Sequence, residues 1–122
     1  RRDCVIHLEA ERPLMIRTDP ELLKRVIQNI LSNCLRYAEH EILIRMSTDG
    51  NSLILLIQDD GPGFLEKDLP HIFERFYQGT KKEGSTGLGL AIVDSICRLQ
   101  NIGLKYYFQN GEHCFEISEE QI

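Results

Sequence analysis

The chain has 122 residues, 42% of them hydrophobic and 27% charged, with a formal net charge of −5 at pH 7. These values are typical of one globular domain, residues 1–122, with its own core. Binding to nucleic acid is not expected, because it needs clustered Lys and Arg to displace counterions from phosphates. The longest apolar run, 53–57, is far too short to span a bilayer, so no direct membrane contact is expected.

The first third of the chain predicts short strands followed by one long helix. Residues 5–8 and 14–16 are β-type runs that indicate a hairpin or a strand pair. Thr18 or Asp19 can cap a helix that has a proline at its first position. Apolar residues then recur at spacings of three and four, which predicts an amphipathic helix that ends near Ala38.

The middle of the chain predicts a β-hairpin and then short helical turns. Residues 41–47 and 53–59 read as strands, and the Asp49-Gly50 pair between them is a strong hairpin signal. Because the second strand is an unbroken apolar run, we expect it to be central and covered on both faces. Residues 68–77 predict one or two helical turns.

The last third predicts a helix and a closing hairpin. Residues 78–86 are polar and predict an exposed, mobile loop. Residues 88–99 predict a second long helix, and 104–108 and 114–117 predict strands around a turn. Paired strands with intervening helices favour an α+β fold, a two-layer α/β sandwich whose mixed sheet is covered on one face by helices.

Two asparagines, Asn29 and Asn33, are spaced so that both amides lie on one face of the first long helix. Asparagine is a poor helix former, so two in register suggest a demand for amide groups. An amide oxygen is a neutral hard ligand that suits Mg²⁺ already held by phosphates. A solvated helix face with two chance asparagines is an equally open alternative.

A second polar site follows the apolar strand. Asp59 stands at the end of that strand, where a carboxylate is costly unless something pairs with it. It can accept a hydrogen bond from an exocyclic amine such as that of adenine. Gly61 and Gly63 would let the backbone pass close beside a flat ring. The alternative is a strand-ending turn with solvated aspartates.

A third site lies at the start of the second helix. Gly87 and Gly89 allow a close backbone approach, and the amides and dipole of a helix start suit phosphate. An ordinary turn before a core helix is the alternative. Arg75, between Phe73 and Phe76, is held on aromatic anchors, and its planar fork suits phosphate oxygens.

Four segments together resemble sensor histidine kinases of two-component systems. Residues 29–37 (NILSNCLRY) resemble their N box, and 59–63 (DDGPG) their first glycine box. Residues 72–77 (IFERFY) resemble their F box, and 85–90 (STGLGL) their second glycine box. The four occur in the family's order with family-like spacing. The resemblance implies a catalytic, ATP-binding domain of the Bergerat fold, with ATP under a mobile lid.

For the metal and the base, the resemblance implies specific contacts. Asn33 would ligate Mg²⁺, with Asn29 beside it. Asp59 would accept a hydrogen bond from the adenine amine, and Tyr37 would stack on the ring or border it. The glycines that would shape the base pocket are Gly61 and Gly63.

For the phosphates, the resemblance implies a second group of residues. Arg36 would lie near the phosphates, and Phe73 and Phe76 would anchor the lid, 78–86. Arg75, Lys81 or Lys82 could contact phosphate, because Gln78 stands where family members often carry a basic residue. The segment that would wrap the phosphates at the helix start consists of Thr86, Gly87, Leu88, Gly89 and Leu90.

Two departures from the family pattern matter. The last hairpin keeps one glycine of the family's third box, so it is expected to support the fold rather than contact a ligand. None of the four histidines has both the acidic residue and the following proline of a phosphoacceptor; they are His7, His40, His71 and His113. His40 is followed by Glu41, but it lies at a helix-to-strand junction and no proline follows. The acceptor is therefore expected on a separate dimerisation and histidine-phosphotransfer domain.

The resemblance implies transfer of the γ-phosphoryl of ATP to that histidine, with a response regulator receiver domain as the further partner. The setting would be the cytoplasmic part of a membrane-bound bacterial sensor. ATPases of the same superfamily carry a water-activating glutamate at the position of Asn29, and an amide cannot take that proton. A non-catalytic or weakly hydrolytic ATP-binding module stays as the alternative.

Overall fold

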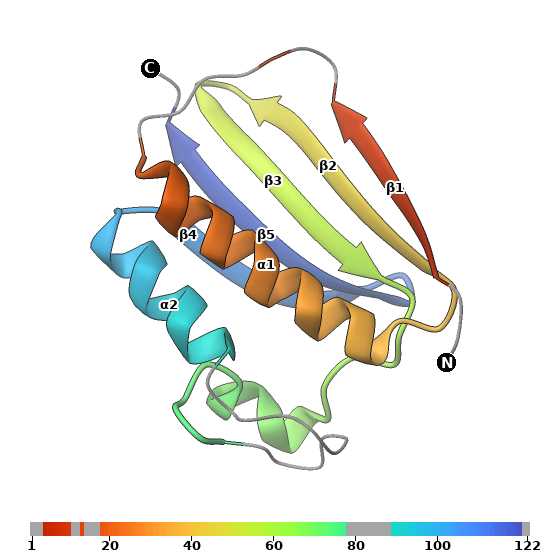
Figure 1. The fold of residues 1–122 in the computed structure, drawn as a ribbon. Helices are drawn as coiled ribbons and strands as arrows, with labels where there is room; N and C mark the ends of the chain where they lie inside the picture. Colours follow the sequence, from red (N-terminus) through yellow and green to blue (C-terminus); the bar gives the residue numbers. More distant parts are fainter. Residues whose placement is uncertain (1–3, 11–12, 14–17, 78–88, 121–122) are drawn as a thin grey trace.

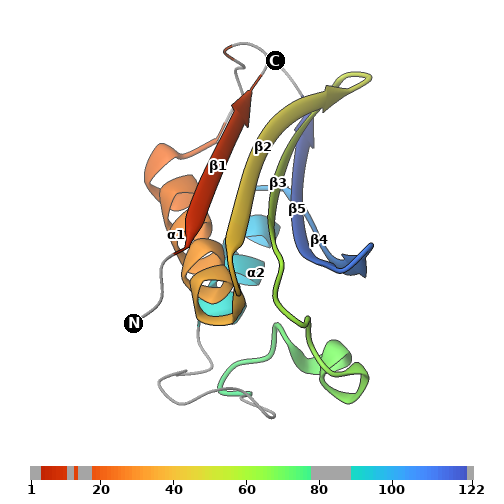
Figure 2. The ribbon, with the colours of Figure 1, turned by 90° about the vertical axis from the view of Figure 1, so that its right-hand side faces the viewer.

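The computed structural model describes residues 4–10, 13, 18–77 and 89–120. A five-stranded sheet in the order β1-β2-β3-β5-β4 carries both long helices on one face (Figure 1). The side view in Figure 2 shows the same two layers. Strand β1 runs parallel to β2, and every other neighbouring pair is antiparallel, which confirms the predicted mixed α+β sandwich. The elements are β1 (Val5–Ala10), α1 (Pro20–Tyr37), β2 (Glu41–Asp49), β3 (Ser52–Asp59), the 3₁₀ helix η1 (Glu66–His71), α2 (Gly89–Leu99), β4 (Gly103–Gln109) and β5 (Glu112–Glu120).

Helix α1 forms as its sequence predicts. The Asp19 carboxylate accepts hydrogen bonds from the backbone amides of Glu21 (2.9 Å) and Leu22 (3.3 Å), which satisfies two of the unpaired donors of the first turn. The helix ends at Tyr37, and the Ala38 amide donates back to the Cys34 carbonyl. The apolar face of α1 packs on β3, while α2 packs beside α1 and against β4.

Strand β3 is central, as predicted, but the expectation that both of its faces are covered is wrong. Leu55, Ile57 and Asp59 face the helices and are buried, whereas the alternate residues Ile54 and Leu56 are only half-buried. The helices lie on one side of the sheet, so the far face of β3 is shielded only by neighbouring strands. An antiparallel sheet tolerates such a one-sided arrangement, and an apolar run alone does not reveal it.

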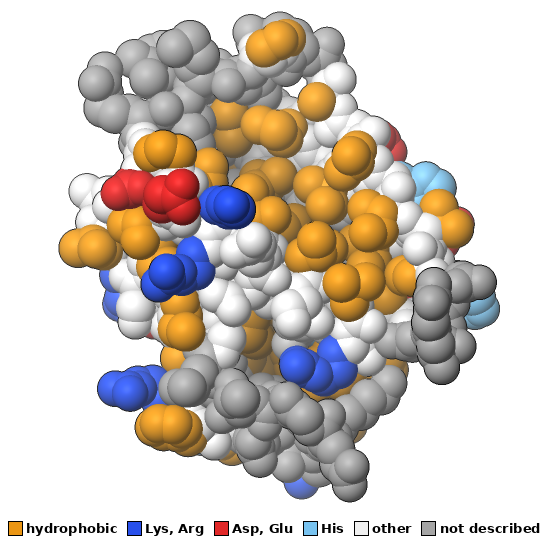
Figure 3. Space-filling model, in the orientation of Figure 1, with side chains coloured by type: hydrophobic (Ala, Val, Ile, Leu, Met, Phe, Trp, Pro, Cys, Tyr) orange, Lys and Arg blue, Asp and Glu red, His pale blue; other side chains and the backbone are white. Residues whose placement is uncertain are grey.

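Strand β1 lies at the edge of the sheet beyond the helices. It begins at the predicted run 5–8 but pairs with β2, in the register Ile6 to Ile42. The second predicted run, 14–16, lies outside the described residues. Ile6 and Leu8 are 44% and 75% exposed, and Figure 3 shows apolar side chains gathered over the part of the sheet that the helices leave uncovered.

Both predicted hairpins are present. Gly50 turns the chain between β2 and β3 with a φ of 62°. Asn110 and Gly111, with φ values of 53° and 77°, reverse the chain between β4 and β5, where Gln109 pairs with Glu112. Positive φ at both positions matches the twist of the flanking strands. The predicted loop 78–86 and the first residue of the predicted second helix lie outside the described residues.

A single apolar core fills the space between the helices and the sheet. Its fully buried members include Val26 and Ile30 from α1, Ile57 from β3, Val93 from α2 and Phe115 from β5. None of the helices within the described ranges is long and apolar enough to cross a membrane. The polar residues discussed below lie where this core meets the C-terminal ends of α1 and β3.

Candidate functional site

The asparagine pair is partly built into the core. The Asn29 side-chain amide donates to the Arg25 carbonyl (3.0 Å), and its Oδ1 lies 3.6 Å from where a Cβ on Gly89 would stand. Asn33 is buried, and its Oδ1 has no hydrogen-bond partner among the described residues. A buried carbonyl oxygen without a partner costs free energy. This favours a missing ligand over the alternative of a solvated helix face.

Asp59, the last residue of β3, is only 1% exposed. Its Oδ1 accepts a hydrogen bond from the Gly61 amide at 2.7 Å, whereas Oδ2 is buried without a hydrogen-bond partner in the described part of the chain. Burial raises the pKa of Asp59 to about 6, and the Gly61 hydrogen bond opposes that rise. The carboxylate is thus held in place by one oxygen and offers the other as an acceptor.

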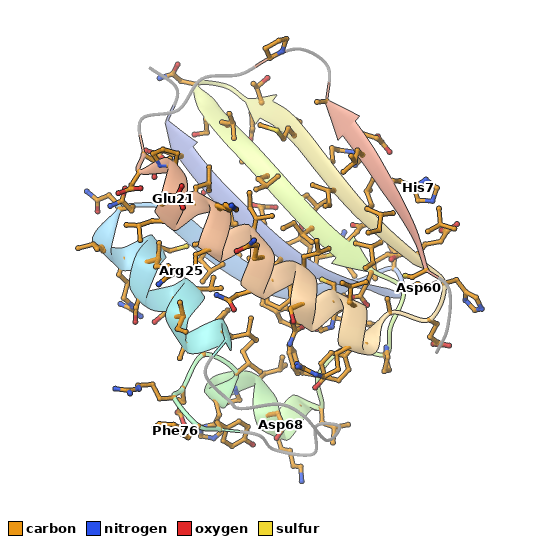
Figure 4. All side chains as sticks on the ribbon, in the orientation of Figure 1. His7, Glu21, Arg25, Asp60, Asp68 and Phe76 are labelled. Atoms are coloured by element: carbon orange, nitrogen blue, oxygen red, sulfur yellow. The ribbon has the colours of Figure 1, made fainter. Side chains whose placement is uncertain are left out.

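Asp60, the next residue, has a structural role instead. Its Oδ1 accepts hydrogen bonds from the backbone amides of Glu39 (2.8 Å) and His40 (3.0 Å), where the chain leaves α1 for β2. Figure 4 labels Asp60 at this junction. Burial acts to raise the pKa of Asp60, but these backbone hydrogen bonds outweigh it and lower the pKa below the ordinary value.

Replacing Asp60 with alanine is expected to reduce the free energy of unfolding by about 1–2 kcal/mol at pH 7, because two backbone amides lose their acceptor. Because the pKa of Asp60 is lowered in the folded state, its carboxylate stabilises the fold at neutral pH, and this stabilisation is lost on acidification. Urea denaturation measures it. His40→Ala removes only an exposed imidazole 3.4 Å from Asp60 and should cost less than about 0.5 kcal/mol. Equal losses for the two variants would contradict this role.

Aromatic rings line the same end of the sheet. Tyr37, at the end of α1, lies parallel to His113 of β5, with ring centroids 6.0 Å apart and an angle of 28°. Phe64 packs against His113 (4.9 Å) and Tyr106 (5.0 Å). The Tyr37 hydroxyl is buried and has no hydrogen-bond partner within the described ranges. The sequence predicts that Tyr37 and Asp59 belong to one base pocket. In the structure both residues lie next to His113.

The two glycines after Asp59 are required by packing. A Cβ on Gly61 would lie 2.8 Å from both Asp59 Oδ1 and the Tyr37 carbonyl carbon. Gly63 has a φ of 75°, and a Cβ there would lie 2.6 Å from the Phe108 ring. These contacts fix the loop against α1 and β4. Their role in shaping a base pocket stays a prediction.

Only part of the predicted phosphate-binding segment is described. Gly89 and Leu90 begin α2, and Gly89 lies beside Asn29. Thr86, Gly87 and Leu88 lie outside the described residues. Arg36, in the last turn of α1, is half-buried next to Tyr37. The start of α2 and the polar face of α1 therefore meet, as the prediction requires.

The F-box residues separate into a core anchor and a surface pair. Phe73 packs against the core, whereas Phe76 is 64% exposed and has a φ of 64°. The Arg75 guanidinium lies 5.3 Å from the Phe76 ring centroid. Arg75 also lines a groove between α1 and α2 together with Leu22 and Ser95, which places it away from Asp59.

Two buried polar residues were missed by the sequence analysis. Asp68 is 4% exposed and accepts a hydrogen bond from the Tyr77 hydroxyl, within the segment that Figure 4 shows beyond the end of α1. His113 is completely buried, and the hairpin that carries it was expected to serve the fold alone. Its position opposite Asp59 depends on which strands pair, so no local pattern could reveal it.

The arrangement limits how a metal could be held. The described residues contain no cluster of three His, Cys, Asp or Glu side chains able to bind a metal ion. A cation at the Asn33 amide would need further oxygen ligands, from other parts of the chain or from a bound molecule. Mg²⁺ commonly binds in this way, through a few protein oxygens and substrate phosphates.

The fold and the site together define an ATP-binding domain of the Bergerat type. The family model described as histidine kinase-, DNA gyrase B- and HSP90-like ATPase matches residues 18–119. The chain belongs to this family, and within it the chain is homologous to the catalytic domains of sensor histidine kinases.

Similar proteins support this assignment. Sensor histidine kinase YkoH of Bacillus subtilis (strain 168) is 32% identical over 116 residues, which cover 92% of this chain and 25% of that protein. The mycobacterial sensor histidine kinase MprB superposes with a TM-score of 0.82 at 24% identity, covering 95% of this chain and 84% of that one. Full-length ShkA in complex with AMPPNP gives a TM-score of 0.73 at 25% identity, covering 96% of this chain and 26% of that one. The chain spans about a quarter of the length of the curated relatives YkoH and CssS, the latter also from Bacillus subtilis.

Proposed function

We propose that this chain binds Mg²⁺–ATP and presents the γ-phosphoryl group to a histidine on a separate domain of the same protein. One observation carries the proposal: Asn33 Oδ1 and Asp59 Oδ2 are buried acceptors without partners among the described residues, on elements that meet at one site. Each would gain a partner from Mg²⁺–ATP. The complex of ShkA with the ATP analogue AMPPNP supports a nucleotide as the ligand.

The base would bind between Asp59 and the aromatic rings. Asp59 Oδ1 is fixed by the Gly61 amide, so Oδ2 is oriented to accept a hydrogen bond from the adenine amine. Tyr37 and Phe64 offer ring surface next to it, with centroids 5.8 Å apart. Aromatic walls of this kind bury a flat ring at little cost in side-chain entropy.

The phosphates would lie between α1 and the start of α2. The first amides of α2 and its dipole favour negative charge, and the Asn29 Oδ1 beside Gly89 is an oxygen that could ligate Mg²⁺ held by the phosphates. Asn33 fits Mg²⁺ because its buried oxygen needs a cation or a donor, with Asn29 adjacent. When bound, Mg²⁺ would neutralise phosphate charge and orient the γ-phosphoryl group. The chain's own residues supply binding and orientation, while the nucleophile comes from the histidine-bearing domain.

The remaining partners follow from the relatives. Sensor histidine kinases such as YkoH are longer than this chain, which supports a histidine-bearing dimerisation domain and a response regulator receiver domain as partners. The proposed setting is the cytoplasmic side of a bacterial sensor anchored in the membrane. Residues 1–122 would form one catalytic domain within it.

Calorimetric titration with AMPPNP tests the nucleotide site. Mg²⁺ is expected to tighten binding by at least about tenfold, and Asn33→Ala should abolish that gain because one buried metal ligand is lost. Gln28→Ala, on the exposed face of α1, is the matched control and should keep the tightening of AMPPNP binding by Mg²⁺. A chain that binds no AMPPNP would refute the proposal and favour a non-catalytic interaction module.

Phosphotransfer is tested in the full-length protein with γ-labelled ATP. Label that is stable to alkali and labile to acid would identify phosphohistidine. Release of inorganic phosphate without any labelled protein would instead support a hydrolytic ATP-binding module.

A further inference from the structure

His113 is a completely buried titratable side chain that the proposed function leaves unused. It is 0% exposed, and its Nε2 has no hydrogen-bond partner within the described ranges. In the β3–β5 ladder His113 is directly opposite Asp59, and the next pair on the same face is Ile57 with Phe115. His113 and Asp59 therefore both project from the sheet toward the helices, into the same site.

The hydrogen bonds around His113 favour one tautomer of its ring. The Phe64 amide donates to the Tyr106 hydroxyl oxygen at 3.3 Å, and that hydroxyl lies 3.0 Å from His113 Nδ1. Since the Tyr106 oxygen already accepts the amide proton, its own hydrogen is available to Nδ1. A neutral imidazole that accepts at Nδ1 carries its proton at Nε2. Burial lowers the pKa of His113 to about 4, so the ring is neutral at pH 7.

An unpaired donor and an unpaired acceptor thus lie on adjacent strands. His113 Nε2–H offers one proton and Asp59 Oδ2 offers one lone pair, yet no hydrogen bond or ion pair joins the two side chains. Directly opposite residues on one face have Cβ atoms about 5 Å apart, so both can reach the edge of one flat ring. Leaving a buried polar group unpaired costs free energy. A ligand edge with a donor next to an acceptor would satisfy both.

We infer that His113 is a specificity-determining residue of the nucleotide site, donating from Nε2 to N1 of adenine, directly or through one water, while Asp59 accepts from the 6-amino group. This inference rests on the proposed function. The adenine edge presents an amine donor beside the N1 acceptor. Guanine presents O6, an acceptor, beside N1–H, a donor, so both contacts would be mismatched. The pair Asp59–His113 would then select adenine over guanine.

The ring packing supports this role. His113 is held between Tyr37, Phe64 and Tyr106, with Tyr106 at a centroid distance of 4.8 Å. The Tyr106 hydrogen bond prevents the imidazole from flipping without loss of a buried contact. The Tyr106 hydrogen bond thus fixes the orientation of this donor before the base binds.

The decisive experiment compares AMPPNP with its 1-deaza analogue, in which C–H replaces N1, in the complete chain with Mg²⁺. AMPPNP is expected to bind at least about tenfold more tightly than the analogue. His113→Phe should weaken AMPPNP about tenfold or more and leave the analogue unchanged, whereas His113→Gln, which keeps a side-chain donor, should restore part of the preference. Equal weakening of both ligands by His113→Phe would overturn the inference.

A measurement without substitution keeps the inference testable if the variants do not fold. In protein labelled with ¹⁵N-histidine, His113 should show the Nε2–H tautomer, and its Nε2–H signal should shift with AMPPNP and much less with the 1-deaza analogue. An Nδ1–H tautomer, or equal shifts with both ligands, would refute the inference. Absence of AMPPNP binding would refute the proposed function itself, whereas tight binding without discrimination at N1 would refute only the role of His113.

Discussion

Asp59→Asn is expected to make the nucleotide-free protein more stable and to weaken ATP binding by about ten- to hundredfold. Burial raises the pKa of Asp59 from 3.8 to about 6, so the folded state carries an unfavourable charge at pH 7. Because one pKa unit corresponds to 1.36 kcal/mol, this charge costs about 3 kcal/mol. Asparagine keeps an oxygen for the Gly61 amide and removes the charge. Its side-chain N–H can also face the adenine amine, which is itself a donor. The hydrogen bond from that amine to a charged carboxylate is then lost.

The dependence of stability on pH provides a sharper form of this test. For Asp59, the raised folded pKa means that its penalty fades as the pH falls from about 6 to 3.8. For His113, the folded pKa of about 4 lies below the ordinary 6.5, so stability is lost as the pH falls through that window. The two effects oppose each other in the parent. The Asp59→Asn variant keeps only the loss of stability that comes from His113. Its free energy of unfolding should therefore fall more steeply than that of the parent on acidification.

Thermal or urea denaturation between pH 4 and 7 and calorimetric titration with AMPPNP measure these effects. Asp60→Asn is the matched control, because that neighbouring carboxylate accepts backbone hydrogen bonds and has a lowered pKa. The control should be less stable than the parent at pH 7 and should bind AMPPNP as the parent does. If Asp59→Asn destabilised the nucleotide-free protein, as Asp60→Asn is expected to do, the conclusion that Asp59 Oδ2 has no partner in the free protein would be wrong.

Gly61→Ala should cost about 3 kcal/mol or more in the free energy of unfolding, the largest effect expected of any single methyl group in this loop. The new Cβ would lie 2.8 Å from the Tyr37 carbonyl carbon and from Asp59 Oδ1. The Tyr37 backbone belongs to the last turn of α1, so relief requires the helix end or the loop to move. The movement would also displace Asp59, whose Oδ1 depends on the Gly61 amide.

The matched control for Gly61 is Gly50→Ala in the β2–β3 turn. No atom lies within 4 Å of a Cβ there, so only the positive φ of 62° opposes alanine, at about 1–2 kcal/mol. Urea denaturation of the two variants separates steric overlap from backbone strain. A Gly61→Ala protein as stable as Gly50→Ala would show that the loop relaxes freely and would contradict the close packing described above.

Much of the fold could be predicted because its signals are local. The spacing of apolar residues and the Asp19 cap define α1 within a residue of its observed end. The expectation that Asp59 is buried came from its place at the end of an apolar run. By contrast, the parallel pairing of β1 with β2 joins segments that an entire helix separates, and the far face of β3 looks the same in sequence whether or not a layer covers it.

The site was predicted unevenly for the same reason. Asn33 and Asp59 are recognisable because each is a polar residue in an apolar pattern. The distinct role of Asp60 depends on amides in the connection between α1 and β2, at Glu39 and His40. The packing reason for Gly61 depends on the end of α1. These interactions join parts of the chain that only the folded sheet brings together.

The two-residue turn Asn110–Gly111 has a consequence for the chemistry of the site. This turn aligns β4 with β5 so that Tyr106 pairs with Phe115 and reaches His113. Side chains alternate between the faces of a strand, so a shift of β5 by one residue would replace His113 beside Asp59 with a cysteine or a glutamate. One inserted residue in the turn would shift β4 relative to β5 and carry the Tyr106 hydroxyl away from His113 Nδ1. On the proposed role of His113, the length of this surface turn therefore helps to determine which base is bound.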